Sequence, residues 1–245
     1  MNKIFNEDCL DGMKRIPDKS IDMILCDLPY GVTKNKWDSI IPLNLLWEQY
    51  ERVIKDKGAI VLTSQDKFTS MLVVSNVNIH KYNLIWEKSR PTGFLNAKKM
   101  PLRSHEDICV FYKKLPTYNP QFSYGLPNNT NTPKGGIRQS NNNYGEMKHT
   151  VDVKTNKKYP KSVLKFDSMN PKELIHPTQK PVALFEYLIK TYTNEGETIL
   201  DNCMGSGTTA IACMNTNRNF IGFELDKDYH EKANQRIASH KLLPQ

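Results

Sequence analysis

Seven short apolar runs recur along this chain of 245 residues, and their spacing limits the folds that it can adopt. Each run is rich in β-branched and aromatic residues and is bounded by Gly, Pro, Asp or Asn, which is typical of buried strands. The runs are Lys3–Phe5, Ile21–Cys26, Ala59–Thr63, Asn83–Trp86, Ile108–Tyr112, Thr198–Leu200 and Asn219–Phe223. Helical patterns alternate with them, with apolar faces formed by Leu46, Tyr50 and Val53 and by Phe185, Leu188, Ile189 and Tyr192. We therefore expect an α/β fold with a mostly parallel seven-stranded sheet flanked by helices.

The composition fits one domain over residues 1–245, because 38% of the residues are hydrophobic and can fill a sizeable core. No apolar run approaches the roughly 20 residues of a membrane helix, and the first ten residues are too polar for a signal peptide. The five cysteines form no C-x-x-C pair, which argues against a disulfide framework and a zinc site. A cytoplasmic protein without a bound metal is the expectation.

A basic segment at residues 116–161 interrupts the alternation of strands and helices. It is crowded with Asn, Pro, Gly, Thr and Lys, and it carries seven basic and two acidic residues, a net charge of +5 out of +8 for the chain. Tyrosine and phenylalanine side chains lie between these charges and could stack on bases. The segment is either an insertion that contacts a polyanion or a solvated polar loop.

The segment from Thr198 to Ala210 is typical of a strand, a tight glycine turn and the start of a helix. Gly205 and Gly207 would let the backbone approach a ligand, and the helix N-terminus offers unpaired N–H groups to a negative group. The next strand ends at Glu224, whose carboxylate could accept hydrogen bonds from both hydroxyls of a ribose. The alternative is a glycine turn that only packs the helix on the strand.

The run Gly205–Ala210 also matches the G-x-G-x-x-A fingerprint of NAD-dependent dehydrogenases. Only 45 residues follow Leu200, too few for the remaining strands of a dinucleotide fold. The rest of the sheet must come from upstream, which implies a rotated order of elements. A P-loop is disfavoured because no Gly-Lys-Ser/Thr follows the glycines.

The strand Ile21–Cys26 leads into Asp27-Leu28-Pro29-Tyr30, and this turn resembles the D-P-P-Y catalytic motif of DNA methyltransferases that act on exocyclic amino groups. The chain also resembles that family at Asn6–Leu10, at Arg103–Phe111, at His176–Pro181 and at Asp201–Thr209, which is similar to the D-P-F-x-G-S-G-T-T loop. The catalytic motif comes first and the cofactor loop last, as in the beta group. Leu28 replaces the first proline of the motif, and Asn202-Cys203 replaces Pro-Phe of the loop.

This resemblance implies a circularly permuted S-adenosylmethionine-dependent methyltransferase fold and an adenine-N6 DNA methyltransferase. The catalytic residues that it implies are Asp27, Leu28, Pro29 and Tyr30. The cofactor, S-adenosyl-L-methionine, would contact Asp8, Cys9, Thr178, Lys180, Asp201, Asn202, Cys203, Gly205, Ser206, Gly207, Thr208 and Glu224. Thr178 and Lys180 would lie near its methionine carboxylate, Glu224 at the ribose and Asp8 near the adenine.

The chemistry explains these residue types. An exocyclic amine is a poor nucleophile because its lone pair is delocalised into the ring. Asp27 and the carbonyl of Leu28 or Pro29 would accept hydrogen bonds from its two N–H groups and direct the lone pair toward the methyl group of the cofactor. The base must leave the duplex, and Tyr30 could stack on it. In isolation, Asp27 could instead cap a helix and Tyr30 could be a core residue. His105 and His176 are better explained as structural residues than as metal ligands, and Cys26 and Cys203 lack a partner base for nucleophilic catalysis.

The partner expected from this resemblance is double-stranded DNA in the cytoplasm of a bacterial or phage-infected cell. The DNA-contacting residues proposed from charge and position are Lys34, Lys36, Trp37, Lys98, Lys99, Arg103, Lys134, Arg138 and Lys148, and residues 116–161 are the candidate target-recognition region. A homodimer and a cognate restriction enzyme are left open. Cytosine-N4 methylation, protein-glutamine methylation and a catalytically inactive DNA-binding homologue are the alternatives.

Overall fold

The computed structural model describes residues 2–32, 38–127, 155–169, 175–176 and 178–241. The chain forms two compact units, one of residues 1–119 and 161–245 and the other of residues 120–160. The second unit lies inside the segment that the sequence marks as an insertion. Within the described residues, no helix has the length and apolar character needed to cross a membrane.

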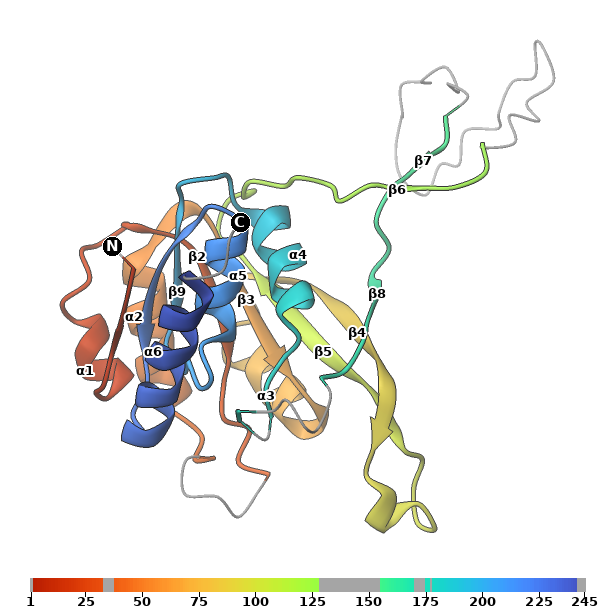
Figure 1. The fold of residues 1–245 in the computed structure, drawn as a ribbon, viewed down its shortest axis with the longest axis horizontal. Coiled ribbons are helices and arrows are strands. Elements are labelled where there is room, and N and C mark those ends of the chain that lie inside the picture. The colour runs from red at the N-terminus through yellow and green to blue at the C-terminus, as the bar shows by residue number, and fades with distance from the viewer. Residues whose placement is uncertain (1, 33–37, 128–154, 170–174, 177, 242–245) are drawn as a thin grey trace. The chain divides into compact units, whose positions relative to one another are not determined.

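An eight-stranded sheet forms the centre of the first unit (Figure 1). Its order is β1 (Lys3–Phe5), β10 (Asn219–Phe223), β9 (Thr198–Asp201), β2 (Ile21–Asp27), β3 (Ile54–Ser64), β5 (Arg103–Phe111), β4 (His80–Thr92) and β8 (Val163–Phe166). Neighbouring strands are parallel except where β5 pairs with β3 and with β4. The predicted α/β architecture is therefore confirmed, and all seven predicted runs are strands.

The eighth strand corrects the predicted number of strands. β8 pairs with β4 at the end of the sheet, where Val163 and Lys165 are exposed and Leu164 is buried. The strand is short and mixes lysine with apolar residues, because an edge strand buries little of its surface. Its sequence therefore lacks the continuous apolar run that marks the central strands.

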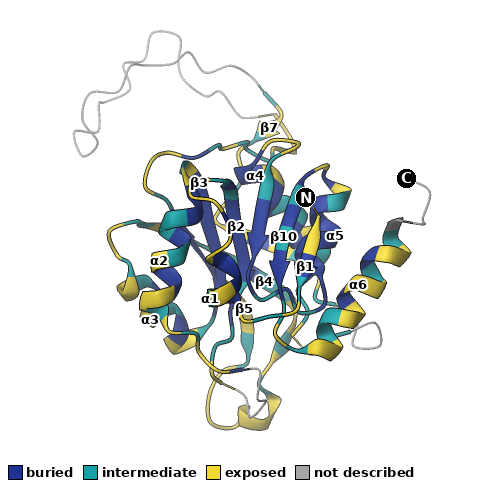
Figure 2. Cartoon of the chain, turned by 90° about the vertical axis from the view of Figure 1, so that its left-hand side faces the viewer, coloured by how far each residue is buried: buried dark blue, intermediate teal, exposed yellow. Residues whose placement is uncertain are grey.

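Helices cover both faces of this sheet (Figure 2). On one face lie α1 (Cys9–Met13), α2 (Leu43–Val53) and α3 (Asp66–Ser75), and on the other lie α4 (Val182–Tyr192), α5 (Thr208–Asn215) and α6 (Lys227–Lys241). Alternate side chains of β2 supply both cores: Ile24 and Cys26 pack toward the first group of helices, and Met23 and Leu25 toward the second. The apolar faces predicted for α2 and α4 are buried as expected.

The carboxyl ends of the central strands meet at one edge of the sheet. Asp27 and Asp201 are the last residues of β2 and β9, and Glu224 directly follows β10. Asp27 stands opposite Thr63 of β3, and Thr63 stands opposite Ile108 of β5. Ligands bind at this edge in open α/β sheets, so the fold gathers the candidate site residues where such a site belongs.

The second unit is described by residues 120–127 and 155–160. Its two short strands, β6 (Ser123–Tyr124) and β7 (Lys157–Lys158), pair in antiparallel fashion. The rings of Phe122 and Tyr159 meet edge to face with centroids 5.0 Å apart, and the Lys157 ammonium lies 5.4 Å from the Phe122 ring. Basic and aromatic side chains are therefore interleaved in this small hairpin.

Candidate active site

The carboxylate of Asp27 is held by donors from three different segments. Tyr30 Oη donates to Asp27 Oδ1 at 2.8 Å, and the hydroxyl of Thr63 donates to the same oxygen. On the other oxygen, Lys180 Nζ donates to Oδ2 at 2.7 Å. These hydrogen bonds fix the orientation of the carboxylate. The side chain of Asp27 is 21% exposed, so a ligand can still reach it. Among the described residues that follow it, 28–32 and 38–42, no helix begins at Asp27.

The ammonium of Lys180 lies between two carboxylates. Besides Asp27, it contacts Glu106 Oε2 at 3.2 Å, and Glu106 in turn pairs with Lys88, so four charged groups alternate in sign. Burial alone would lower the pKa of Lys180, but Asp27 and Glu106 outweigh it and raise the pKa. The resemblance implies that Lys180 lies near the cofactor carboxylate, and in the structure its ammonium contacts the carboxylate of Asp27.

Tyr30 is fixed at both ends of its side chain. Its ring stacks on Phe68 with centroids 5.1 Å apart, and Lys180 Nζ lies 5.6 Å from the ring centroid. Burial, followed by the charge of Asp27, raises the pKa of its hydroxyl, which therefore stays protonated and can donate. Leu28 is buried, and Pro29 is half-buried between it and Tyr30. The turn is thus a rigid platform next to Asp27.

The glycine loop is tied to Glu224. Gly205 N donates to Glu224 Oε2 at 2.7 Å, and Asp226 N donates to Oε1 at 2.9 Å. Gly205 and Gly207 have φ values of +52° and +78°, a conformation that favours glycine. Burial raises the pKa of Glu224, and the two backbone N–H groups oppose that shift. A carboxylate has about four lone-pair sites, so two N–H donors leave room for two hydroxyl donors.

Asp201 and Asn202 lie beneath this loop, fully inside the protein. Thr209 donates its hydroxyl to Asp201 Oδ2, and Cys203 N donates to Oδ1 at 3.0 Å. Burial raises the pKa of Asp201 to about 6, despite these hydrogen bonds. Tyr50 donates its hydroxyl to the Asn202 amide oxygen. Both residues therefore shape the loop from below.

Two cysteine sulfurs flank the amide nitrogen of Asn202. Asn202 Nδ2 lies 3.5 Å from the sulfurs of both Cys9 and Cys203. Hydrogen bonding from Cys203 is the largest influence on Cys9 and lowers its pKa, whereas the thiol interactions of Cys203 with Cys26 and Cys9 raise its own. No group of three or more His, Cys, Asp or Glu suited to a metal occurs among the described residues. The cysteines thus form part of the wall below the loop.

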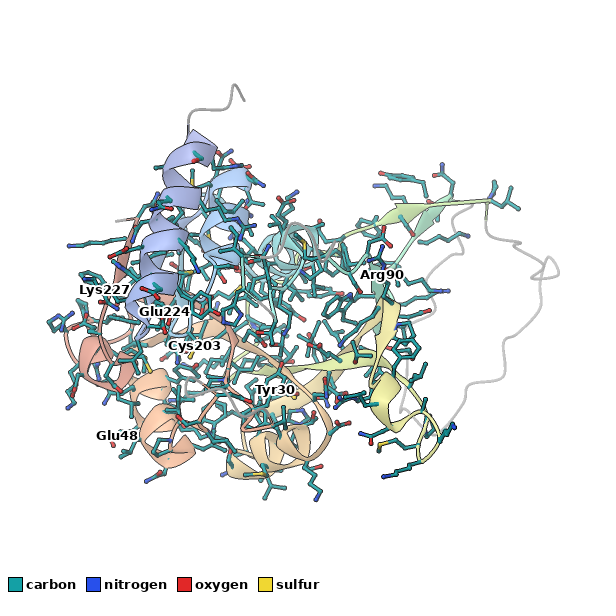
Figure 3. All side chains as sticks on the ribbon, turned by 60° about the horizontal axis from the view of Figure 1, so that its bottom comes forward. Tyr30, Glu48, Arg90, Cys203, Glu224 and Lys227 are labelled. Carbon is teal, nitrogen blue, oxygen red and sulfur yellow. The ribbon has the colours of Figure 1, made fainter. Side chains whose placement is uncertain are left out.

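The remaining cofactor candidates lie around the same strand ends. Asp8 caps α1 by accepting from Leu10 N at 2.8 Å, so its position follows from the start of that helix. Ser206 and Thr208 are buried, and Arg236 of α6 donates to the carbonyl of Ser206 at 3.0 Å. Thr178 is exposed and contacts the ring of His176 at 3.0 Å. Glu224, Cys203 and Tyr30 follow one another across this edge in Figure 3.

The proposed DNA-contacting residues divide into two groups. Lys98 and Lys99 are exposed in the β4–β5 connection, and Arg103, at the start of β5, pairs with Asp66 at 2.8 Å. The other proposed residues lie outside the residues that the structure describes. They are Lys34, Lys36, Trp37, Lys134, Arg138 and Lys148.

Sequence reasoning missed Thr63, Glu106 and Lys88. Thr63 could have been found from the rule that strand ends meet at the ligand edge, because its strand neighbours the strand of Asp27. Glu106 lies within the segment Arg103–Phe111 that resembles the family, yet the resemblance gave it no role. Lys88 left no local signal, because its pairing with Glu106 depends on how β4 lies against β5.

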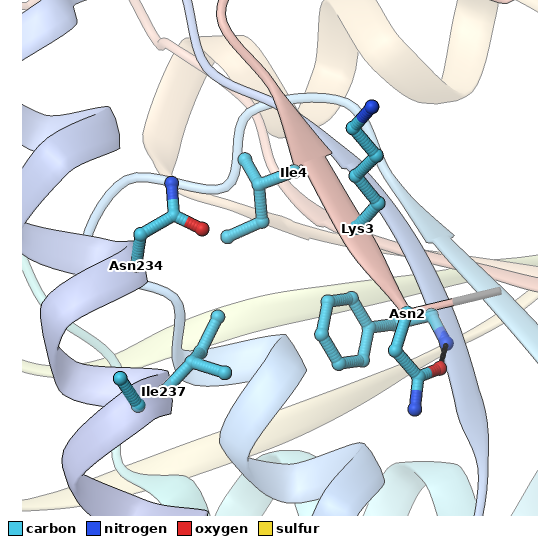
Figure 4. A pocket seen from close by; sticks show the side chains of 7 residues that line it. Asn2, Lys3, Ile4, Asn234 and Ile237 are labelled. Atoms are coloured by element: carbon cyan, nitrogen blue, oxygen red, sulfur yellow. Dashed lines mark hydrogen bonds between the residues drawn. The ribbon is translucent and has the colours of Figure 1, made fainter.

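A cavity of about 250 Å³ lies elsewhere, between β1, β10 and α6 (Figure 4). It is lined by Asn2, Lys3, Ile4, Phe220, Asn234, Ile237 and Ala238, and the side chain of Asn2 accepts from Phe220 N at 3.0 Å. These residues lie toward the amino ends of their strands. The cavity therefore contains none of the candidate site residues.

Comparison with known proteins agrees with this geometry. The family model described as DNA methylase matches residues 21–235. Type II methyltransferase M.HpaI of Haemophilus parainfluenzae is 27% identical, covering 97% of this chain and 74% of that protein. The DNA adenine methyltransferase YhdJ of Escherichia coli is 26% identical, covering 97% of this chain and 83% of that protein.

Solved structures share the fold over almost the whole chain. The M1.HpyAVI–SAM complex superposes with a TM-score of 0.65 at 24% identity, covering 97% of this chain and 99% of that one. The cytosine-N4-specific PvuII DNA methyltransferase gives a TM-score of 0.66 at 13% identity, covering 100% of this chain and 87% of that one. With the matched family model spanning most of its length, this chain belongs to the DNA methylase family.

Proposed function

We propose that this DNA methylase transfers a methyl group from S-adenosyl-L-methionine to the N6 amino group of adenine in duplex DNA. The observation that carries the proposal is the Asp27 carboxylate, oriented by Tyr30, Thr63 and Lys180 at the strand edge that also holds the glycine loop. Adenine is favoured because the motif begins with aspartate and because a relative matched over 83% of its own length is named as an adenine methyltransferase. The reaction runs in the bacterial cytoplasm, where its DNA substrate lies.

The residues present fit the cofactor. Glu224 keeps acceptor capacity for ribose hydroxyls beside the two backbone N–H groups that already bind it. Gly205 and Gly207 hold the loop in left-handed conformations that bring its backbone close to a ligand. S-adenosylmethionine, when bound, supplies an electrophilic methyl group on a sulfonium. Asp8 and Glu224 would hold its adenosine portion, and Ser206 and Thr208 would contact its methionine portion.

Asp27 activates the target amine by accepting a hydrogen bond. The amine lone pair is delocalised into the adenine ring, so the amine must be held with its N–H bonds directed at fixed acceptors. Asp27 and the carbonyl of Leu28 provide those acceptors on one side. As the amine nitrogen displaces the sulfur from the methyl carbon, the S–C bond breaks and a neutral thioether leaves. Positive charge develops on nitrogen next to the carboxylate, and the surplus proton leaves to Asp27 or to water.

Lys180 acts as a positioning residue for this carboxylate. Its ammonium binds Asp27 Oδ2, and Glu106 holds that ammonium from the other side. The Tyr30 and Thr63 hydroxyls bind Oδ1, so the carboxylate cannot rotate without breaking charged hydrogen bonds. Tyr30 presents its ring beside Asp27, where it can pack against the extruded base.

We also propose two protein partners, a restriction enzyme and a second copy of this chain. A cognate restriction enzyme is suggested by relatives that are named type II methyltransferases. A homodimer is the oligomer that we propose from the sequence alone. DNA modified by the protein is then expected to resist the enzyme that cleaves the same sequence. Light scattering of the protein alone is expected to give twice the monomer mass.

The test of the function is to identify the methylated base. Purified protein is incubated with unmethylated genomic DNA and isotopically labelled S-adenosylmethionine, and the digested nucleosides are analysed by mass spectrometry. Label on N6 of deoxyadenosine is expected, and it should be lost with Asp27→Ala and retained with Asp228→Ala, an exposed aspartate on α6. Label on cytosine would replace adenine as the substrate, and absence of label with the folded protein would contradict the proposal.

A further inference from the structure

The β4–β5 hairpin extends past the catalytic edge of the sheet. Asp27 is level with Thr63 and Thr63 with Ile108, yet β4 and β5 stay paired from Ile85↔Asp107 to Glu87↔His105 and, after a register shift, again at Thr92↔Arg103. The residues of β5 before Ile108 therefore reach about 16 Å beyond the level of Asp27, at about 3.3 Å per residue. Figure 1 shows this hairpin arm, which we define as Lys88–Arg103, projecting at the bottom beyond the body of the sheet.

The arm has the charge of a surface that binds a polyanion. Between Lys88 and Arg103 there is no aspartate or glutamate, and Arg90, Lys98 and Lys99 are exposed there. Arg103 is partly exposed and pairs with Asp66 at the start of α3. A surface of one sign at the catalytic edge attracts a negatively charged substrate toward the site.

The tip of the arm is apolar. Phe94 is 67% exposed, Leu95 is 101% exposed and Met100 is 57% exposed. Gly93, with φ of +93°, leads into the 3-10 turn η1 (Phe94–Asn96), and Met100 N donates to Asn96 O at 3.0 Å. The tip is thus an ordered turn that presents large apolar side chains to solvent among cations. Exposed apolar patches rimmed by polar residues are typical of binding surfaces.

The root of the arm is fixed to the catalytic carboxylate through buried charges. Lys88 and Glu106 form an ion pair in which both side chains are less than a tenth exposed. Glu106 also contacts Lys180, and Lys180 binds Asp27. The root of the arm is therefore fixed relative to Asp27, as the support of a group that acts on the same nucleotide must be.

We propose that the arm enters duplex DNA next to the target base, and that Phe94 and Leu95 occupy the gap that the flipped base leaves in the stack. This inference rests on the proposed function. Apolar side chains inserted between base steps offset the cost of unstacking, while the flanking cations bind phosphates. The arm thus lowers the cost of base flipping, and Asp27 performs the chemistry on the flipped base.

The experiment compares two duplexes that contain the methylation site mapped with the wild-type protein. In one, the target adenine is paired; in the other, it lies opposite an abasic site and flips without breaking a pair. The variant is Phe94→Ala/Leu95→Ala, and the control is Leu115→Ala, a residue 74% exposed that follows the opposite end of β5. We expect kcat/KM of the double variant to fall about tenfold or more on the paired duplex and far less on the abasic duplex.

A second measurement reads the flipping itself. 2-Aminopurine at the target position becomes fluorescent when it leaves the stack, and the double variant is expected to give a weaker signal at saturating protein. Equal activity of variant and wild type on the paired duplex would overturn the inference, as would an equal loss on both duplexes. Failure of the proposed function is distinct, because the wild-type protein would then methylate neither duplex.

Discussion

Lys180 holds the carboxylate of Asp27, the proposed catalytic group, because its ammonium is shared by Asp27 and Glu106. Replacing it, as in Lys180→Gln, leaves the partly exposed Asp27 and the buried Glu106 without their common cation. We expect kcat to fall by roughly tenfold to a hundredfold, because Asp27 is no longer held toward the amine. The free energy of unfolding should also fall, by about 3 kcal/mol, the usual cost of removing one partner of a buried ion pair.

The measurement must separate positioning from cofactor binding. Isothermal titration with S-adenosylmethionine, done below the melting temperature of the variant, is expected to give an unchanged Kd, with the loss confined to single-turnover methylation. Lys190→Gln, on the exposed face of α4, serves as the matched control. A large loss of cofactor affinity in Lys180→Gln would instead return this residue to the cofactor carboxylate, as the sequence suggested.

Asp201 makes stability depend on pH. Burial raises its pKa from 3.8 to about 6, so the folded protein holds this proton more tightly than the unfolded chain does. Its contribution therefore stabilises the fold below about pH 4, and it is lost as pH rises through about 6. Between pH 4.5 and 7.5 the expected loss is about 2 kcal/mol.

Urea unfolding of wild type and Asp201→Asn at these two pH values tests this prediction. The asparagine cannot ionise, so the variant does not lose this stability as the pH rises. The free energy of unfolding of the variant minus that of wild type should therefore increase from the lower to the higher pH. A constant difference between the two proteins would show that Asp201 does not titrate in this range.

At the scale of elements, α1 packs against the end of β10 where Gly12 faces the ring of Phe223. A Cβ built on Gly12 would lie 2.2 Å from the Phe223 ring, and that ring is buried. Gly12→Ala gains about 1 kcal/mol of helix propensity but costs about 1–3 kcal/mol in overpacking. We expect net destabilisation in thermal unfolding, whereas Gly125→Ala, with 3.5 Å to its nearest neighbour, should be neutral. A more stable Gly12→Ala protein would show that the ring moves aside freely.

The hairpin arm gives a prediction that concerns charge alone. Lys98 and Lys99 are exposed and are expected to bind phosphates, so Lys98→Gln/Lys99→Gln should weaken DNA binding at low salt. The slope of log K against log salt should become shallower by about two, because two fewer counterions are released. Fluorescence anisotropy at several salt concentrations measures this slope. An unchanged slope would place the phosphate contacts elsewhere on the chain.

Much of this architecture is readable in the sequence, because the central strands are buried on both faces and so form continuous apolar runs such as Ile21–Cys26. β8 escaped prediction because an edge strand needs little apolar surface, and β3 begins at Ile54, before its apolar run, with Lys55 and Lys57. At the site, Asp27 and the glycine loop stand out locally. Thr63, Glu106 and Lys88 do not, because their roles arise only when β2, β3, β4 and β5 lie side by side.

At the scale of the whole molecule, the described catalytic and cofactor candidates belong to the first unit, and residues 120–160 form the second. The chain leaves the first unit at Asn119, where Asn119 N donates to Thr191 O at 2.8 Å, and it returns at Lys161 ahead of β8. Both anchors stay in place if the segment between them is replaced. Folding and methyl transfer should therefore depend on the first unit, and recognition of the DNA sequence on residues 120–160.

We expect a protein with residues 120–160 replaced by a Gly/Ser linker to fold and to bind S-adenosylmethionine like the wild type. The removed segment carries six basic and two acidic residues, so DNA affinity should fall and its salt dependence should weaken. Methylation mapped across genomic DNA should lose its preference for one sequence, because the candidate recognition region is gone while Asp27 and the arm remain. Retention of the same methylated sequence would assign its recognition to the first unit, where the hairpin arm is the next surface to test.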